Sequence, residues 1–102
     1  MRDLVLTTKY KKDLKGLSKN PLFSKYSVIL VDYLARLQRG EPLPEKAHNH
    51  TLSKSSPKIY QGCWDFHVVP DICVIYRKTK DTIELIRIGQ HNNLGLTENF
   101  SD

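Results

Sequence analysis

The sequence predicts a small α+β domain in which two N-terminal helices pack on one face of a small antiparallel sheet. Three observations predict it. Two successive segments have apolar residues at helical spacing, three later segments are rich in β-branched and aromatic residues, and short polar turns separate those later segments. The expected order is β-α-α-β-β-β, with the last three strands as a meander. A chain of 102 residues has room for one core, so residues 1–102 are expected to form a single domain.

The first part of the chain reads as a short strand followed by a helix. Residues 3–8 have strand composition, and Thr7 or Thr8 can cap a helix that runs to Lys19. The buried stripe of this helix is expected to consist of Tyr10, Leu14 and Leu17.

A second helix is expected over residues 21–39. Asn20 and Pro21 form a cap followed by proline at the first helical position, and Gly40 ends the helix. Its inward residues would be Phe23, Tyr26, Ile29, Leu30, Tyr33, Leu34 and Leu37.

The second half of the chain is predicted to form the sheet. Residues 41–46 contain two prolines and form an extended connector. The three strands are expected at residues 58–68, 71–78 and 82–88, joined by tight turns. A short helical turn is expected after the last strand.

Composition and charge indicate the cellular compartment of the protein and the kind of partner that it binds. No apolar run approaches the length of a membrane span, and residues 1–7 lack the apolar core of a signal peptide, so a cytoplasmic protein without a membrane partner is expected. Cys63 and Cys73 are interpreted as buried apolar residues in a reducing compartment. The net charge of +5 favours a polyanionic partner, either nucleic acid or an acidic protein.

The lysines of the first predicted helix are the candidate contacts to such a partner. By default they form a solvated helix face, whereas the more specific interpretation is contact with RNA or the ribosome. The candidate RNA- or ribosome-binding residues are Lys11, Lys12, Lys15, Lys19 and Lys54.

Histidines and an arginine fall near predicted strand ends and loops, where they can meet on one rim of the sheet. They are His50, His67, His91 and Arg87. Cleavage of RNA by its own 2′-hydroxyl needs a base, an acid and positive charge on the phosphate; histidine suits both proton transfers and arginine suits the phosphate. Asp71 could orient a histidine and raise its pKa. This chemistry needs no metal or other cofactor.

Each of these residues also has an ordinary structural interpretation. A lone strand histidine is more often hydrogen-bonded within the fold, Asp71 after proline is a common turn residue, and Arg87 could form a surface ion pair. His48 and His50 have a spacing that places two imidazoles on one strand face, which would suit zinc. The chain has no Cys-x-x-Cys or His-x-x-x-His motif, so a metal site is not favoured.

Three stretches together resemble a known family. They are H-T-L at 50–52, W-D-F-H-V-V-P-D-I-C-V-I-Y at 64–76 and R-I-G-Q-H at 87–91. They closely resemble the YafQ branch of the RelE/ParE superfamily, the toxins of bacterial type II toxin–antitoxin pairs, and the match covers residues 43–91. The chain departs from the branch pattern at Ile72, where tryptophan is usual, and at Gly95, where an aromatic residue is usual; Phe100 follows five residues later.

The resemblance implies a RelE-like fold and a ribosome-dependent endoribonuclease that cuts mRNA in the ribosomal A site. It implies His91 and His50 as the leading proton-transfer residues and Arg87 as the residue that holds the scissile phosphate. His67 and Asp71 would form a coupled pair that binds or helps to ionise the nucleotide. The implied partners are an antitoxin protein, the ribosome and mRNA, with operator DNA bound only through the toxin–antitoxin complex.

Two other functions are compatible with the sequence. One is a superfamily relative that inhibits DNA gyrase without cleaving nucleic acid, although such relatives generally lack this set of histidines. The other is a basic RNA-binding module without catalysis.

Overall fold

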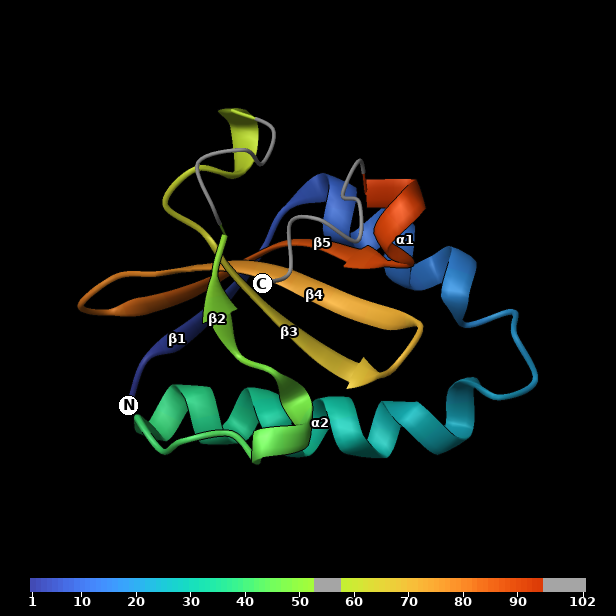
Figure 1. Ribbon diagram of the computed structural model, residues 1–102, viewed down its shortest axis with the longest axis horizontal. Coiled ribbons are helices and arrows are strands. Elements are labelled where there is room, and N and C mark those ends of the chain that lie inside the picture. The colour runs from blue at the N-terminus through green and yellow to red at the C-terminus, as the bar shows by residue number, and fades with distance from the viewer. Residues whose placement is uncertain (53–57, 95–102) are drawn as a thin grey trace.

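The computed structural model describes residues 1–52 and 58–94, and its order of elements is that of the predicted α+β fold. Helices α1 and α2 follow strand β1, and the remaining strands come after them (Figure 1). The elements are β1 (Asp3–Leu6), α1 (Thr8–Leu17), α2 (Phe23–Arg39), β2 (His50–Thr51), β3 (Trp64–Val69), β4 (Ile72–Lys78) and β5 (Thr82–Gly89), with 3-10 turns η1 (Glu45–Ala47), η2 (Lys58–Tyr60) and η3 (His91–Leu94).

The strands form one mixed sheet in the order β1-β5-β4-β3-β2. Strands β3, β4 and β5 make the expected antiparallel meander. Two features go beyond the prediction: β1 lies parallel to β5, and the short β2 adds to β3 as the opposite edge. A parallel pair needs a long crossover, and here the two helices and the meander separate β1 from β5 along the chain.

Local side-chain contacts set the helix ends, and two predicted ends are corrected. Thr7 caps α1 by accepting a hydrogen bond from the Tyr10 amide at 3.1 Å, and the helix ends at Leu17 rather than at residue 19. Helix α2 begins at Phe23 rather than at residue 21, because the Asn20 side chain accepts the Leu22 amide at 2.8 Å and holds a turn there.

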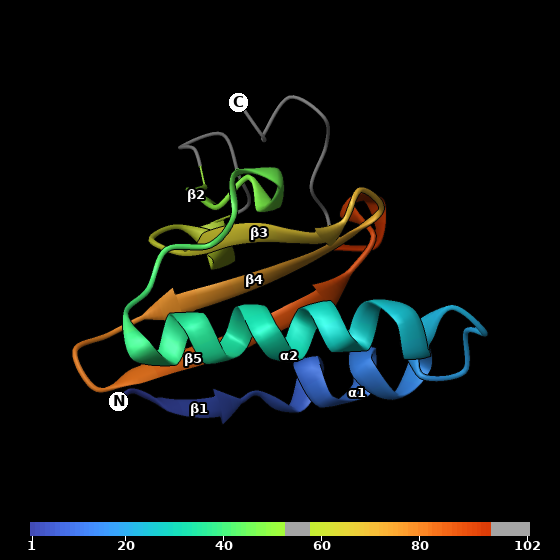
Figure 2. The ribbon, with the colours of Figure 1, turned by 90° about the horizontal axis from the view of Figure 1, so that it is seen from below.

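The two faces of the sheet differ in what covers them. Both helices pack with the inward side chains of the sheet in one large core, and Figure 2 shows α2 lying across the strands. The sheet residues of this core are Phe66, Val68, Ile72, Val74, Tyr76, Ile83, Leu85 and Ile88. The opposite face carries a second, smaller cluster that consists of Leu52, Tyr60, Cys63, Cys73, Ile75 and Leu94. This second face, which we call the helix-free face, therefore owes its cover to short turns and loops.

The strand predicted at residues 58–68 is corrected at its start. The chain first forms the turn η2 and then passes Gly62, whose φ of 81° lies in the left-handed region that favours glycine. Strand β3 begins only at Trp64. This detour places Tyr60 in the smaller cluster instead of in the sheet.

Within residues 1–52 and 58–94, none of the helices combines the length and the apolar character required to cross a membrane.

Candidate active site

A row of paired residues crosses the helix-free face. His50 of β2 pairs with Asp65 of β3, Asp65 with Ile75 of β4, and Ile75 with Arg87 of β5. Residues that pair across neighbouring strands project to the same face, and Ile75 belongs to the smaller cluster. Three strand spacings separate the ends of the row, so the backbones of His50 and Arg87 are roughly 14 Å apart. His50 and Arg87 thus lie at opposite ends of this row, which together with His67 beside it we call the strip.

His67 and Cys73 form a second, shorter row beside the first. His67 pairs with Cys73, and Cys73 pairs with Gly89 at the end of β5. His67 is partly exposed, and its Nδ1 lies 3.3 Å from the carbonyl oxygen of Pro70 in the β3–β4 turn. Asp71 is exposed in the same turn. A hydrogen bond to the turn backbone therefore orients the His67 ring.

His50 is held from two sides. Its Nδ1 contacts the carbonyl oxygen of His48, and since a carbonyl can only accept, Nδ1 carries the proton. Its Nε2 is buried and lies 3.9 Å from a carboxylate oxygen of Asp65. Asp65 is therefore a carboxylate that lies next to a site histidine.

Asp65 is an ionisable group inside the sheet. It is 1% exposed, and burial raises its pKa to about 7, an effect that the neighbouring Cys73 thiol partly offsets. Burial likewise raises the pKa of the Cys73 thiol, and the adjacent Asp65 raises it further. Asp65 therefore changes charge close to neutral pH, next to His50.

His48 lies beside the site but outside β2. It follows η1 with φ of 49°, and its ring centroid is 6.0 Å from that of His67. Both histidines line a cavity of about 590 Å³ whose remaining walls are Ile29, Lys46, Val68, Val69 and Pro70. The expected arrangement of His48 and His50 on one strand face is not found, because the left-handed turn at His48 comes before the strand.

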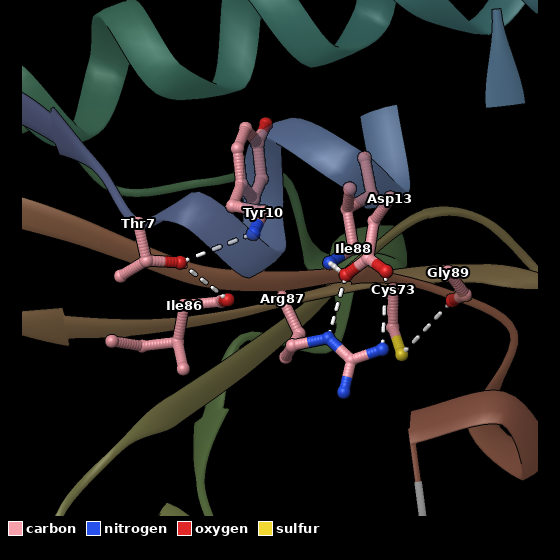
Figure 3. A network of polar contacts seen from close by, with 8 residues as sticks. All are labelled: Thr7, Tyr10, Asp13, Cys73, Ile86, Arg87, Ile88 and Gly89. Atoms are coloured by element: carbon pink, nitrogen blue, oxygen red, sulfur yellow. Dashed lines mark hydrogen bonds and ion pairs between the residues drawn. The ribbon is translucent and has the colours of Figure 1, made fainter. Parts of the chain in front are cut away.

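Arg87 is fixed by an acidic residue from α1 (Figure 3). Its Nε and Nη2 donate to the two carboxylate oxygens of Asp13 at 2.6 and 3.1 Å, and Asp13 also accepts the Ile88 amide at 3.2 Å. The hydrogen bonds to Asp13 raise the pKa of Arg87, so the guanidinium stays charged. Burial raises the pKa of Tyr60, and the neighbouring Arg87 partly offsets this rise.

The other predicted site residues have simpler positions. His91 opens η3 two residues after β5, and its side chain is outside what the structure describes. The four lysines of the first helix and its end are exposed: Lys11, Lys12, Lys15 and Lys19. Lys54, Gly95 and Phe100 lie outside the described residues.

Sequence reasoning missed Asp13 and Asp65. Asp65 sits two residues before His67 in a period-2 strand, so strand alternation alone could have placed both on one face. Asp13 gave no such signal, since a single acid among helix lysines is typical of a solvated surface.

The described groups include residue types that phosphate chemistry requires. A charged guanidinium at one end of the strip and two imidazoles at the other provide an anion site and groups for proton transfer. Within residues 1–52 and 58–94, no group of three or more His, Cys, Asp or Glu side chains is arranged to hold a metal ion.

Replacing Asp65 by Asn is expected to flatten the pH dependence of stability. The carboxyl has a pKa of 3.8 when unperturbed and about 7 in the fold. Folding therefore favours its protonated form, and its stabilising contribution is complete below about pH 4 and is lost as the pH rises through 7. The full shift corresponds to about 4 kcal/mol.

Urea unfolding between pH 5 and 8 measures this difference. The free energy of unfolding of the wild-type protein should fall with pH relative to that of Asp65→Asn. Asp81→Asn, at an exposed turn position, should follow the wild-type curve. Parallel curves for wild type and Asp65→Asn would contradict the raised pKa.

The fold and the site together define a class: a RelE-like α+β domain with histidines and a clamped arginine on the helix-free face of its sheet. A family model described as the bacterial toxin of type II toxin–antitoxin systems, YafQ, matches residues 2–96. The chain belongs to this YafQ family of toxins. Comparison with curated protein sequences gives no match.

Solved structures of related toxins share the fold. YafQ from Escherichia coli BL21(DE3) is 28% identical, with a TM-score of 0.76 over 92% of this chain and 98% of that one. A copper-bound single-substitution mutant of a Helicobacter pylori toxin is 26% identical, with a TM-score of 0.79 over 92% and 99%. In the Escherichia coli DinJ–YafQ toxin–antitoxin complex, the matching chain is 31% identical, with a TM-score of 0.73 over 91% and 96%.

Proposed function

We propose that this toxin is a ribosome-dependent endoribonuclease that cuts mRNA in the ribosomal A site and thereby stops translation. The observation that carries the proposal is the strip of His50, Asp65, His67 and Arg87 on the helix-free face. Membership of the YafQ family supports it, because these residues occupy the motif positions through which the sequence resembles that family.

The proposed reaction uses the RNA's own 2′-hydroxyl. A histidine removes the hydroxyl proton, the 2′-oxygen forms a bond to phosphorus, and the bond from phosphorus to the 5′-oxygen breaks. A second histidine protonates the departing 5′-oxygen, so the products are a 2′,3′-cyclic phosphate and a free 5′-hydroxyl. The candidates for these two tasks are His50, His67 and His91.

The geometry suggests different parts for these histidines. The Nε2 of His50 is buried against Asp65, whereas His67 is partly exposed and borders a cavity. We assign His67, which can reach the nucleotide, one of the two proton transfers. His50, buried against Asp65, would support the site from behind. Asp71, exposed in the turn beside His67, would help to ionise or bind the nucleotide, and His91 would transfer the other proton.

Positively charged side chains have the remaining roles in the proposed mechanism, which are to bind the phosphate and the ribosomal RNA. Arg87 would hold the phosphate and offset the charge that develops in the transition state. The exposed lysines of α1, together with Lys54, would contact ribosomal RNA through its phosphates. No step of this mechanism is assigned to a metal ion or other cofactor.

The same basic surface suits the proposed protein partner. An antitoxin segment rich in Asp and Glu would complement a chain of net charge +5 and could wrap it on folding. The DinJ–YafQ complex is the precedent among related structures. Binding to operator DNA would occur through the antitoxin in that complex.

Mapping mRNA 5′ ends after brief induction of the toxin tests the proposal. New ends should fall in frame within translated regions, and they should vanish when initiation is blocked or when His91 is replaced by Ala. Equal cutting of naked RNA would remove the ribosome from the mechanism. Growth inhibition without new ends would favour a non-catalytic toxin, such as one that acts on gyrase.

A further inference from the structure

We infer that Asp13 is a positioning residue that fixes Arg87 so that the phosphate is bound by only one edge of the guanidinium. The inference rests on the proposed nuclease function and adds to it a residue outside the motifs of the sequence. Asp13 lies on α1, 74 positions before Arg87 in the chain.

The ion pair of Asp13 with Arg87, which we call the clamp, forms at the edge of the sheet where β1 ends. Strand β1 ends at Leu6, which pairs with Leu85, so the last part of β5 has no parallel neighbour. Side chains of α1 and its cap take over there: the Thr7 hydroxyl donates to the Ile86 carbonyl at 2.9 Å, and Asp13 accepts the Ile88 amide (Figure 3). The Asp13 carboxylate is therefore fixed by the backbone of β5 as well as by α1.

The pairing register of β5 shifts at the same place. Arg87 pairs with Ile75 and Leu85 pairs with Tyr76, so Ile86 is an extra residue in β5. A bulge of this kind redirects the side chain that follows it. Here the backbone irregularity and the bond from Ile88 to Asp13 act on neighbouring residues, and together they set the direction of the Arg87 side chain.

The hydrogen bonds decide which donors remain for a substrate. Nε and Nη2 face the two oxygens of Asp13, which is a side-on pair. In Figure 3 the third guanidinium nitrogen, Nη1, points away from Asp13. Nη2 carries a second hydrogen, so Nη1 and Nη2 together form an end-on edge, next to the Tyr60 phenol, that can face two oxygens of one phosphate.

The clamp is protected from water, which distinguishes it from ordinary surface pairs. The side chains of Arg87 and Asp13 are 21% and 17% exposed, whereas those of Arg36 and Asp32 are 36% and 52% exposed. A shielded bidentate pair keeps its geometry better than an exposed one. Lys12 and Asn20 line a cavity of about 400 Å³ with both clamp residues, and apolar residues such as Leu17 and Ile72 complete its walls.

Asp13 also lowers the net positive charge near the phosphate, so its removal has two opposed effects. Loss of the charge should strengthen attraction to RNA, whereas loss of the clamp should misplace the guanidinium in the transition state. Ribosome binding reports the first effect and the cleavage rate reports the second, because the chemical step depends on correct placement of the guanidinium.

The test compares Asp13→Asn with Asp32→Asn in ribosome binding and in single-turnover mRNA cleavage at saturating toxin. Both variants remove one negative charge, but Asp32 pairs with Arg36 on the exposed side of α2. We expect Asp13→Asn to bind ribosomes at least as tightly as Asp32→Asn and to cleave about 10- to 100-fold more slowly. Equal cleavage by the two variants, or faster cleavage by Asp13→Asn, would overturn the inference.

Arg87→Lys provides the second measurement and covers the case in which Asp13→Asn does not fold. Lysine keeps the charge but cannot engage Asp13 side-on and a phosphate end-on together. We expect Arg87→Lys to lose nearly as much rate as Arg87→Ala, and Asp13→Asn to cause no further loss in the Arg87→Lys background. A lysine variant with near wild-type rate, or additive losses, would refute positioning. Absence of ribosome-dependent cleavage by the wild-type toxin would instead refute the proposed function.

Discussion

Replacing Arg87 by Ala is expected to lower the single-turnover rate of mRNA cleavage on the ribosome by about 10²- to 10³-fold, the usual cost of losing a group that stabilises transition-state charge. The variant should still bind ribosomes, since the exposed lysines of α1 remain. Cleavage is measured by primer extension on a defined message, and growth inhibition after induction should fall in parallel.

Arg77→Ala is the matched control for this variant. Arg77 lies on β4, and its Nη1 donates to Glu84 at 3.1 Å, with 44% of its side chain exposed. The Arg77→Ala substitution also removes one positive charge, from β4 next to β5, and it should leave the cleavage rate close to that of the wild-type toxin. If Arg77→Ala and Arg87→Ala lose the same amount of rate, net charge and not the position of Arg87 is responsible.

Replacing His67 by Gln is expected to lower the cleavage rate by about 10²- to 10⁴-fold, the range for loss of a general acid or base. Glutamine can preserve the hydrogen bond to the Pro70 carbonyl but cannot exchange a proton near neutral pH. The pH dependence of single-turnover cleavage should lose one of its limbs in this variant, whereas ribosome binding should change little.

His48→Asn controls for the neighbouring imidazole. His48 shares a cavity with His67, and asparagine tolerates its left-handed backbone. This variant should keep the wild-type rate and both limbs of the pH profile. A full loss of activity in His48→Asn, with His67→Gln unaffected, would transfer the proposed role from His67 to His48.

The local elements followed from the sequence because they depend on nearest neighbours. Helical spacing up to residue 19 and over residues 21–39 predicted α1 and α2, and β-branched runs with short turns predicted β3, β4 and β5. The errors fell at ends, where one side chain decides, as at Asn20 before α2 and Gly62 before β3. Motif spacing also singled out His50, His67, Asp71, Arg87 and His91 as candidates, and their roles remain predictions.

What the sequence by itself determined was the order of the elements, and it supplied candidate residues for the site. The tertiary structure decided which side chains meet. Asp65 faces His50 because β2 pairs with β3 in one particular register, and Asp13 reaches Arg87 because β1 ends early and α1 takes its place along β5. Both contacts join segments far apart in the chain, and their geometry depends on strand register and on a bulge. Local periodicity does not encode such pairing between segments, so the contacts of these two acids became visible only in the folded protein.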